Sequence, residues 1–126
     1  MKIINNYSES NEVYCFMLLS NCINFEHIED REYILENLKY IEKEKKSLSK
    51  KICDDIDKFI NEVINPIIYD SNYFDFMYKA EYGVFDKNNH FVIKSEQALD
   101  MLIYELYNHT INLHEKLLKI FAKHIK

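Results

Sequence analysis

The scarcity of turn-forming residues is the strongest constraint on the fold of this chain. Gly83 is the only glycine and Pro66 the only proline in a sequence of 126 residues. A β-sandwich or β-barrel needs turn residues about every 8 to 12 positions, because each short strand ends in a tight turn. Two such residues cannot supply those turns, so the sequence favours a mainly helical fold.

Length and hydrophobic content indicate a single helical domain that spans residues 1–126. The length is close to the usual size of one domain and is too short for two separate cores. Hydrophobic residues make up 48% of the chain, with 8 phenylalanines and 10 tyrosines among them. This apolar content is enough to offset the conformational entropy lost on folding, so we expect a packed domain.

The longest helical pattern covers residues 29–64. Apolar side chains keep a three-and-four spacing through it without glycine or proline, and Asn65 with Pro66 is expected to end it. One continuous helix here would be about 54 Å long, whereas a compact domain of this size has a diameter of about 36 Å. The apolar spacing stays in phase throughout, so we favour one helix. The alternative is a reversal of the chain at residues 47–49.

Polar caps predict a helix near each end of the chain. Ser10 and Asn11 are expected to cap a first helix that ends at about residue 24, and Ser95 a final helix that ends at about residue 125. The two long helices are similar in length, and an antiparallel pair is the simplest arrangement for them. We therefore expect an elongated bundle of three to four helices, in which the first helix covers two long antiparallel ones.

The segment before the final helix has a different pattern. Residues 81–85 and 90–94 combine β-branched and aromatic side chains, and the turn-forming residues 86–89 lie between them. This order predicts one small β-hairpin, after a short helix at residues 73–78. An isolated hairpin is only marginally stable in water, so we expect this one to pack at one end of the helices.

Leucine and isoleucine recur every seven residues in the final helix. The positions are Leu99, Leu106, Leu113 and Ile120. This repeat is typical both of a core-facing stripe and of a dimerising coiled coil. We favour the core stripe, because polar residues occupy the alternate seam positions, and keep a homodimer through the long helices as an alternative.

The cysteines and the N-terminal sequence suggest a reducing compartment. Cys15 and Cys22 would lie about 10 Å apart on one helix, beyond the limit of about 7 Å for a disulfide, and Cys53 makes their number odd. A signal sequence is not apparent, and the apolar run at residues 13–19 is too short to cross a membrane. We expect free thiols and a cytoplasmic protein. Arg31 is the only arginine, which is typical of an AT-rich coding source such as a phage or virus. If the source is a phage or virus, we expect the protein in the host cytoplasm.

No residue pattern predicts a catalytic, metal or cofactor site. His109 and His114 are five positions apart, about 140° around a helix, and so face different directions. Glu105 and His109 share a face, but di-iron bundles place their Glu and His three positions apart. Cys53 stands beside two aspartates, whose negative charge disfavours the thiolate needed for nucleophilic catalysis. We therefore expect a protein that is not an enzyme and needs no cofactor.

Aromatic residues gather in one part of the chain. Residues 69–91 hold 8 of the 18 aromatic side chains. Tyrosine and phenylalanine on a rigid scaffold favour protein binding, because each ring gives a large contact area at low entropic cost. We predict a non-catalytic module that covers a protein partner of unknown identity, as an inhibitor, immunity or anti-defence protein or a small assembly subunit. The candidate residues are Tyr69, Tyr73, Phe74, Tyr78, Tyr82, Phe85, Asp86 and His90.

A lysine cluster supports the alternative hypothesis of a nucleic-acid-associated regulator or small nucleoprotein subunit. It consists of Lys43, Lys45, Lys46, Lys50 and Lys51. The net charge of −5 weakens any broad attraction to phosphates, and arginine, the usual reader of bases and phosphates, occurs once. We therefore rank this alternative below protein binding.

Overall fold

The computed structural model describes residues 11–124 and confirms the mainly helical fold with a small hairpin. The α-helices are α2 (Asn11–Cys22), α3 (Arg31–Glu44), α4 (Lys50–Phe59), α5 (Asn65–Tyr69) and α6 (Glu96–His124). The strands are β1 (Gly83–Phe85) and β2 (Phe91–Ile93), and the short helical turns are η1 (Lys45–Ser47), η2 (Ile60–Ile64) and η3 (Asp75–Met77). The predicted cap at Ser10 and the predicted end at residue 125 lie outside the described residues.

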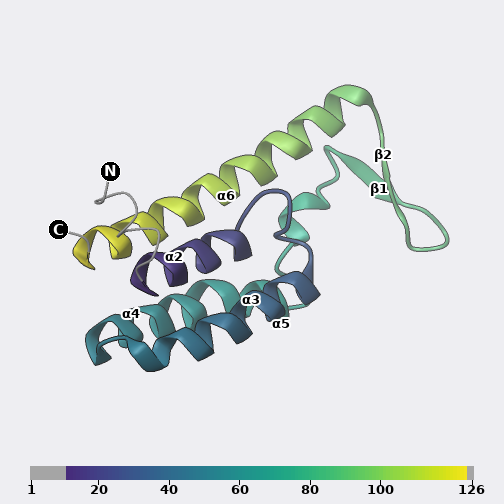
Figure 1. The fold of residues 1–126 in the computed structure, drawn as a ribbon. Coiled ribbons are helices and arrows are strands. Elements are labelled where there is room, and N and C mark those ends of the chain that lie inside the picture. The colour runs from purple at the N-terminus through teal and green to yellow at the C-terminus, as the bar shows by residue number, and fades with distance from the viewer. Residues whose placement is uncertain (1–10, 125–126) are drawn as a thin grey trace.

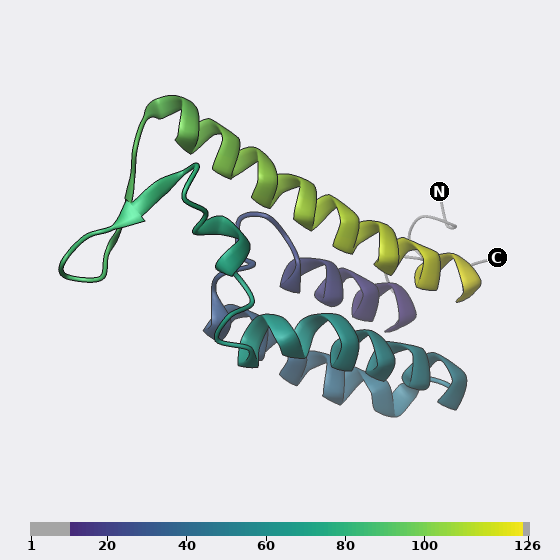
Figure 2. The same ribbon diagram turned by 180° about the vertical axis from the view of Figure 1, so that it is seen from behind.

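The helices form three layers (Figure 1). The longest helix, α6, lies on one side, α2 lies in the middle, and α3 packs beside α4 and α5 on the other side; the view from behind shows the same order (Figure 2). The buried core consists mainly of aliphatic side chains from all three layers, with Leu19, Ile34, Ile41, Ile56 and Phe59 among the most completely buried. The middle helix therefore has core contacts on two sides.

The prediction of one continuous helix over residues 29–64 was wrong, and the alternative reversal is present. Helix α3 ends at Glu44, the turn η1 follows, and Ser49 begins α4 by accepting a hydrogen bond from the backbone N–H of Ile52. Lys45 closes the reversal with ion pairs to Glu42 on α3 and Asp57 on α4. Folding the segment back lets both halves bury their apolar stripe in one core, which a single long rod cannot do. Because residues 29–64 fold back into shorter helices, the expected antiparallel pair of long helices of similar length is absent.

Pro66 does not end the helical segment as predicted. The chain passes through the π-helical turn η2, in which the backbone N–H of Asn65 bonds to the carbonyl of Ile60, and continues in α5 to Tyr69. A π turn holds one more residue than an α turn, which moves the carbonyl with which a proline ring would otherwise clash. The wider turn therefore accommodates the proline within the helical path.

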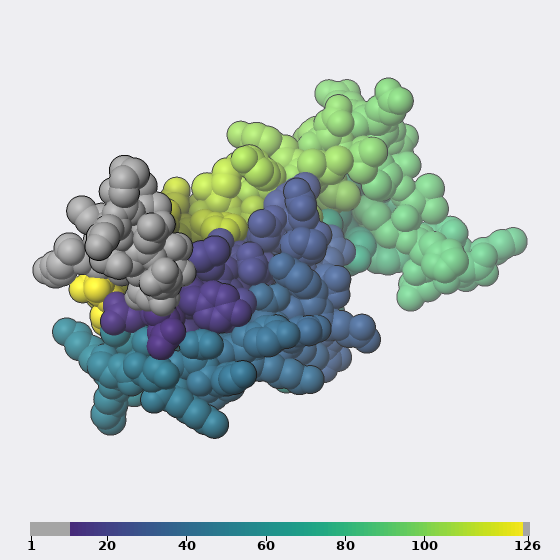
Figure 3. Space-filling model, viewed as in Figure 1, coloured from purple at the N-terminus to yellow at the C-terminus, as the bar shows by residue number. Residues whose placement is uncertain are grey.

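The predicted hairpin is confirmed, and it extends beyond the helical layers (Figure 3). Strands β1 and β2 pair antiparallel, with Gly83 opposite Ile93 and Phe85 opposite Phe91. Gly83 is required here because a Cβ atom at this position would lie 2.2 Å from the carbonyl oxygen of Val92. We call residues 78–94 the hairpin arm. The predicted short helix before it is reduced to the turn η3.

Helix α6 starts where the sequence predicts, because Ser95 Oγ accepts a hydrogen bond from the backbone N–H of Ala98 at 3.0 Å. Of the seven-residue repeat, Leu106 and Leu113 are buried, Ile120 is half-buried and Leu99 is exposed. The repeat therefore faces the core of the bundle over most of its length. It leaves the core at the end of α6 that adjoins the hairpin arm.

Candidate functional site

The structure divides the eight predicted partner-binding residues into an exposed group and an internal group. Tyr69, Tyr78, Phe85, Asp86 and His90 are exposed. Tyr73 and Phe74 are half-buried against the core, and Tyr82 is 5% exposed. The predicted aromatic surface is therefore narrower than the sequence suggested. Tyr69 ends α5 and lies under the guanidinium of Arg31, whereas the other four exposed residues belong to the hairpin arm.

Tyr73 links the segment before the hairpin arm to α6. Its hydroxyl lies 2.5 Å from Nε2 of His109, and the two rings meet edge to face. Burial raises the pKa of Tyr73 to about 12. Burial, aided by the charge of Lys116, lowers the pKa of His109. A protonated tyrosine therefore donates to a neutral imidazole at neutral pH.

Glu105 forms a second link, one helical turn before His109. Its carboxylate accepts a hydrogen bond from Lys79 Nζ at 2.7 Å and another from the Tyr82 hydroxyl. Burial acts to raise the pKa of Glu105, but the hydrogen bonds from Lys79 and Tyr82 outweigh it and lower that pKa. The hydrogen bond to Glu105 raises the pKa of Tyr82 to about 12. We call these five residues, Tyr73, Lys79, Tyr82, Glu105 and His109, the tether.

The tether contains residue types that occur in acid–base catalytic sites. Its side chains are bonded to one another, however, and so form a structural link between two segments. Glu105 and His109 border a shallow hollow together with Phe76, Asn108 and Asn112. Each of the two titratable groups is already paired with a side chain from the segment that leads into the hairpin. Within residues 11–124, no three His, Cys, Asp or Glu side chains converge closely enough to hold a metal ion. These hydrogen bonds hold the hairpin arm in one orientation relative to α6.

No sequence pattern marks the tether as a unit. Glu105 and His109 are recognisable as sharing a helix face, but their partners lie 23 to 36 positions earlier in the chain. Only the way in which η3 folds back onto α6 brings them together. Sequence alone therefore does not separate Tyr73 and Tyr82 from exposed aromatic residues, although their hydroxyl groups bond to side chains of α6.

Three rings of the hairpin arm form a cluster on one face of the ribbon. The ring centroids of Phe85 and Phe91 are 5.2 Å apart, those of Tyr78 and Phe91 5.2 Å, and those of Tyr78 and Phe85 5.7 Å. Val84 and Val92 pair across the opposite face and are both exposed. The ribbon therefore carries accessible apolar side chains on both faces.

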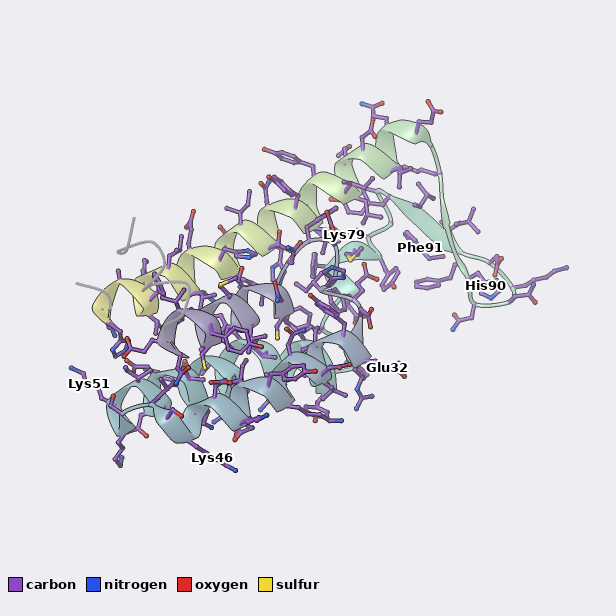
Figure 4. All side chains as sticks on the ribbon, viewed as in Figure 1. Glu32, Lys46, Lys51, Lys79, His90 and Phe91 are labelled. Atoms are coloured by element: carbon purple, nitrogen blue, oxygen red, sulfur yellow. The ribbon has the colours of Figure 1, made fainter. Side chains whose placement is uncertain are left out.

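The tip of the hairpin arm is polar and ordered by Asp86. Its carboxylate accepts hydrogen bonds from the backbone N–H groups of Asn88 and His90, each at 2.9 Å. Asn89 adopts a left-handed backbone with φ of 65°, which asparagine tolerates better than most residues. His90 stands at the outer end of the molecule (Figure 4). Asp86 thus shapes the loop itself, in addition to any contact it makes with a partner.

Lys46 and Lys51 of the lysine cluster lie on the side of the molecule away from His90 (Figure 4). Lys45 is bound to Glu42 and Asp57, and Lys50 is bound to Asp54 at 2.9 Å. Ion pairing thus neutralises two of the five predicted nucleic-acid-binding lysines. Lys43, Lys46 and Lys51 are exposed around the reversal between α3 and α4.

The cysteines are free thiols, as predicted. Burial raises the pKa of Cys15 to about 11 and that of Cys22 to about 12. Both thiols are therefore protonated at neutral pH and closed off from reagents. Cys53 is half-buried, and its thiol points to the carbonyl of Lys45 at 3.3 Å.

Comparison with known proteins finds no match among family models, curated proteins or solved structures. Among the described residues, the helices are too short or too polar to cross a membrane. Function is therefore inferred from the geometry of residues 11–124 alone.

Proposed function

We propose that this protein is a non-catalytic protein-binding module that covers part of a partner's surface with its hairpin arm. Its role would be that of an inhibitor, an immunity or anti-defence protein, or a small assembly subunit. The exposed side chains of Tyr78, Val84, Phe85 and Val92 would form the contact, with Asp86 and His90 at its polar rim. An apolar centre within a polar rim is the usual anatomy of a protein interface.

One observation carries this proposal: beyond its base at Lys79 and Tyr82, the arm extends past the helical layers and is apolar on both faces. Val84 is 63% exposed on one face and Phe85 52% on the other. A two-stranded ribbon has no second layer to cover it, so these side chains stay in contact with water in the free protein. Exposed apolar surface of this kind marks an interaction site. Within residues 11–124 the two strands pair only with each other, so their outer edges add backbone donors and acceptors that an extended segment of a partner could pair with.

The tether supports the proposal because it reduces the entropic cost of binding. Tyr82 in the arm and Tyr73 in the segment before it donate hydrogen bonds to α6, and these bonds attach the base of the arm to that helix. An interface that is oriented before binding loses less conformational freedom when the partner arrives. The three helical layers then serve as the scaffold that positions the arm.

The test compares two matched aromatic substitutions. Phe85→Ser removes a half-exposed ring from the arm, and Tyr40→Ser removes one of similar exposure, 46%, from α3 in the helical layers. Tagged wild-type protein and both variants are used for affinity capture from the cells that make the protein, followed by quantitative mass spectrometry. We expect one partner to be lost with Phe85→Ser and retained with Tyr40→Ser, with both melting temperatures close to wild type. Equal retention by both variants would contradict the proposal.

The nucleic-acid alternative rests on the exposed Lys43, Lys46 and Lys51. Binding through three lysines would weaken steeply with salt, because each phosphate contact releases counterions. Gel retardation of DNA and RNA at low ionic strength tests it, with Lys43→Glu/Lys46→Glu/Lys51→Glu as the comparison. Absence of any retardation for the wild-type chain would eliminate this alternative.

The cytoplasmic location and the homodimer through the long helices remain predictions.

A further inference from the structure

The hydrogen-bond pattern of the hairpin arm shows which backbone groups point away from the ribbon. The backbone N–H of Lys94 donates to the carbonyl of Tyr82, and that of Asp86 donates to the carbonyl of His90. Bonded and non-bonded residue pairs alternate along an antiparallel ladder, so the first and third pairs between these two are non-bonded. They are Gly83 with Ile93 and Phe85 with Phe91. The N–H and C=O groups of these four residues therefore point outward, from two residues on each edge.

The outer edge of β1 is partly closed by the protein itself. The N–H of Gly83 donates to the carbonyl of Lys79 at 3.3 Å, and Gly83 is buried. The chain enters the ribbon through β1 from η3, so this edge adjoins the segment that is tied to α6 (Figure 1). A further strand would have to displace that segment in order to pair with β1 along its length.

The outer edge of β2 is open. Within residues 11–124, the backbone N–H and C=O groups of Phe91 and Ile93 have no hydrogen-bond partner. Figure 1 shows β2 on the side of the ribbon away from α3 and α5. Two donors and two acceptors therefore alternate along an edge that no other part of the described chain covers. An extended segment carries the matching groups at the same spacing.

Strand β2 also lacks the features by which proteins protect a strand edge. Charged residues, proline and bulges normally keep another strand from pairing with an exposed edge. The sequence of β2 is Phe91, Val92, Ile93, and its register with β1 runs without a bulge. An uncharged, regular edge of this kind is a template for strand addition.

The charges beside β2 favour an acidic segment over a second copy of the chain. Side chains alternate between the two faces of a strand, so His90, Val92 and Lys94 share one face. Lys94 is exposed, and within residues 11–124 it forms no ion pair. A second β2 paired antiparallel about Val92 would set Lys94 of one copy beside His90 of the other, without an acidic side chain on either strand. A different protein can place a carboxylate beside Lys94.

We propose that the partner of the hairpin arm supplies an extended segment that pairs with the outer edge of β2 and enlarges the ribbon to three strands. The segment carries apolar side chains opposite Phe91 and Ile93 and an acidic side chain beside Lys94. This inference rests on the function proposed above, because it names what the arm binds. It adds the specific claim that the backbone of β2, and not only its side chains, makes the contact.

Two matched backbone replacements test this claim. Phe91 and Phe85 lie opposite each other, and their N–H groups point outward on different edges. Phenyllactic acid in place of either residue keeps the ring and exchanges the N–H for an ester oxygen. Each replacement also weakens one ladder hydrogen bond, because the carbonyl before it becomes a poorer acceptor, so the effects on the hairpin are matched. The probe is the protein that the wild-type chain captures and Phe85→Ser does not, and calorimetry with purified proteins measures the affinity.

We expect the Phe91 ester to bind the probe about fivefold more weakly than the wild type, the usual effect of one backbone hydrogen bond, and the Phe85 ester to bind it within about twofold of the wild type. Equal affinities of the two esters would overturn strand addition at β2, while the loss of capture by Phe85→Ser would still support the proposed function. Full capture by Phe85→Ser would remove both. A wild-type dimer that the Phe91 ester alone dissociates would assign the edge to a second copy and overturn the proposal as well.

Hydrogen exchange provides a readout on the edge itself. In the free protein the amides of Phe91, Ile93 and Phe85 should exchange rapidly, because none of them is bonded in the ladder. In the complex with the same probe, exchange at Phe91 and Ile93 should slow, whereas exchange at Phe85 should stay rapid. Rapid exchange at Phe91 and Ile93 in the complex would contradict strand addition.

A pair of lysine substitutions tests the acidic side chain of the segment. Lys94→Gln removes the charge at the end of β2, and Lys87→Gln removes an exposed charge from the hairpin loop. We expect Lys94→Gln to weaken binding of the probe about threefold, the effect of one cross-strand charge pair, and Lys87→Gln to leave it nearly unchanged. Binding by Lys94→Gln at wild-type strength would contradict the proposed acidic partner of Lys94.

Discussion

The helical layers and the hairpin arm contain similar apolar residues, but these residues are buried in the layers and exposed in the arm. In the layers, side chains such as Ile56 and Phe59 are almost fully buried between helices. In the arm, Phe85 and Val84 remain largely in contact with water, because a two-stranded ribbon has no partner layer. Apolar content alone therefore does not indicate a core: the layers supply the stability of the domain, and the arm supplies accessible surface.

The largest expected effect comes from the helical layers. Phe59→Ala should lower the free energy of unfolding by about 3 to 5 kcal/mol, because it removes a buried ring and leaves a cavity. Phe85→Ala in the arm is the matched control and should have a much smaller effect. Urea denaturation followed by circular dichroism measures both. Equal losses would show that the arm belongs to the cooperative core and would remove the distinction.

A smaller effect is expected where the two regions meet. Tyr73→Phe removes the hydroxyl that His109 accepts from, and should lower the free energy of unfolding by about 1 kcal/mol, the usual net worth of one such hydrogen bond. Hydrogen exchange should show faster exchange for amides of the arm and little change in α2 and α3. Faster exchange spread evenly over all helices would mean that the tether does not act locally.

The sequence predicts those features of the structure that depend on residues close together in the chain, and not those that depend on residues far apart in it. Ser95 starting α6 and the hairpin turn at residues 86–89 were predictable, because a local side chain or turn decides each of them. The reversal after Glu44 was only the alternative prediction, because the apolar spacing stays in phase through it and only the shared core favours folding back.

The candidate site shows the same dependence. The aromatic enrichment located the arm, but it could not separate exposed rings from internal ones. Tyr82 faces inward because of Glu105, which lies 23 positions later in the chain. The exposure of Tyr107 and Leu118 on α6 was not predicted either, because the seven-residue repeat of that helix points to a different side.

The pH dependence of stability provides a second test of the tether. Burial lowers the pKa of His109 in the folded chain, so the unfolded chain binds the proton more readily below its own value of 6.5. Its contribution is therefore fully present above pH 6.5 and is lost as the pH falls through the folded pKa. His109→Gln should flatten the decline in melting temperature over this acidic window. An unchanged pH profile in His109→Gln would show that His109 does not contribute.

The smallest expected effect belongs to the exposed face of the arm. Val84→Ser should change the free energy of unfolding by less than about 0.5 kcal/mol, because the side chain is already in water. Urea denaturation again provides the measurement. A loss above about 2 kcal/mol would mean that Val84 packs against the domain in solution and is not available to a partner.

The proposed function requires that the hairpin arm is the surface that binds a partner protein. The most direct measurement is photo-cross-linking in the cells that make the protein, with a benzophenone amino acid replacing Phe85 in one variant and Tyr40 in another. Both positions are about half exposed, one in the arm and one on α3. We predict a discrete adduct with one partner from position 85 and none with that partner from position 40. An adduct from position 40 alone, or no protein adduct from position 85, would contradict the claim.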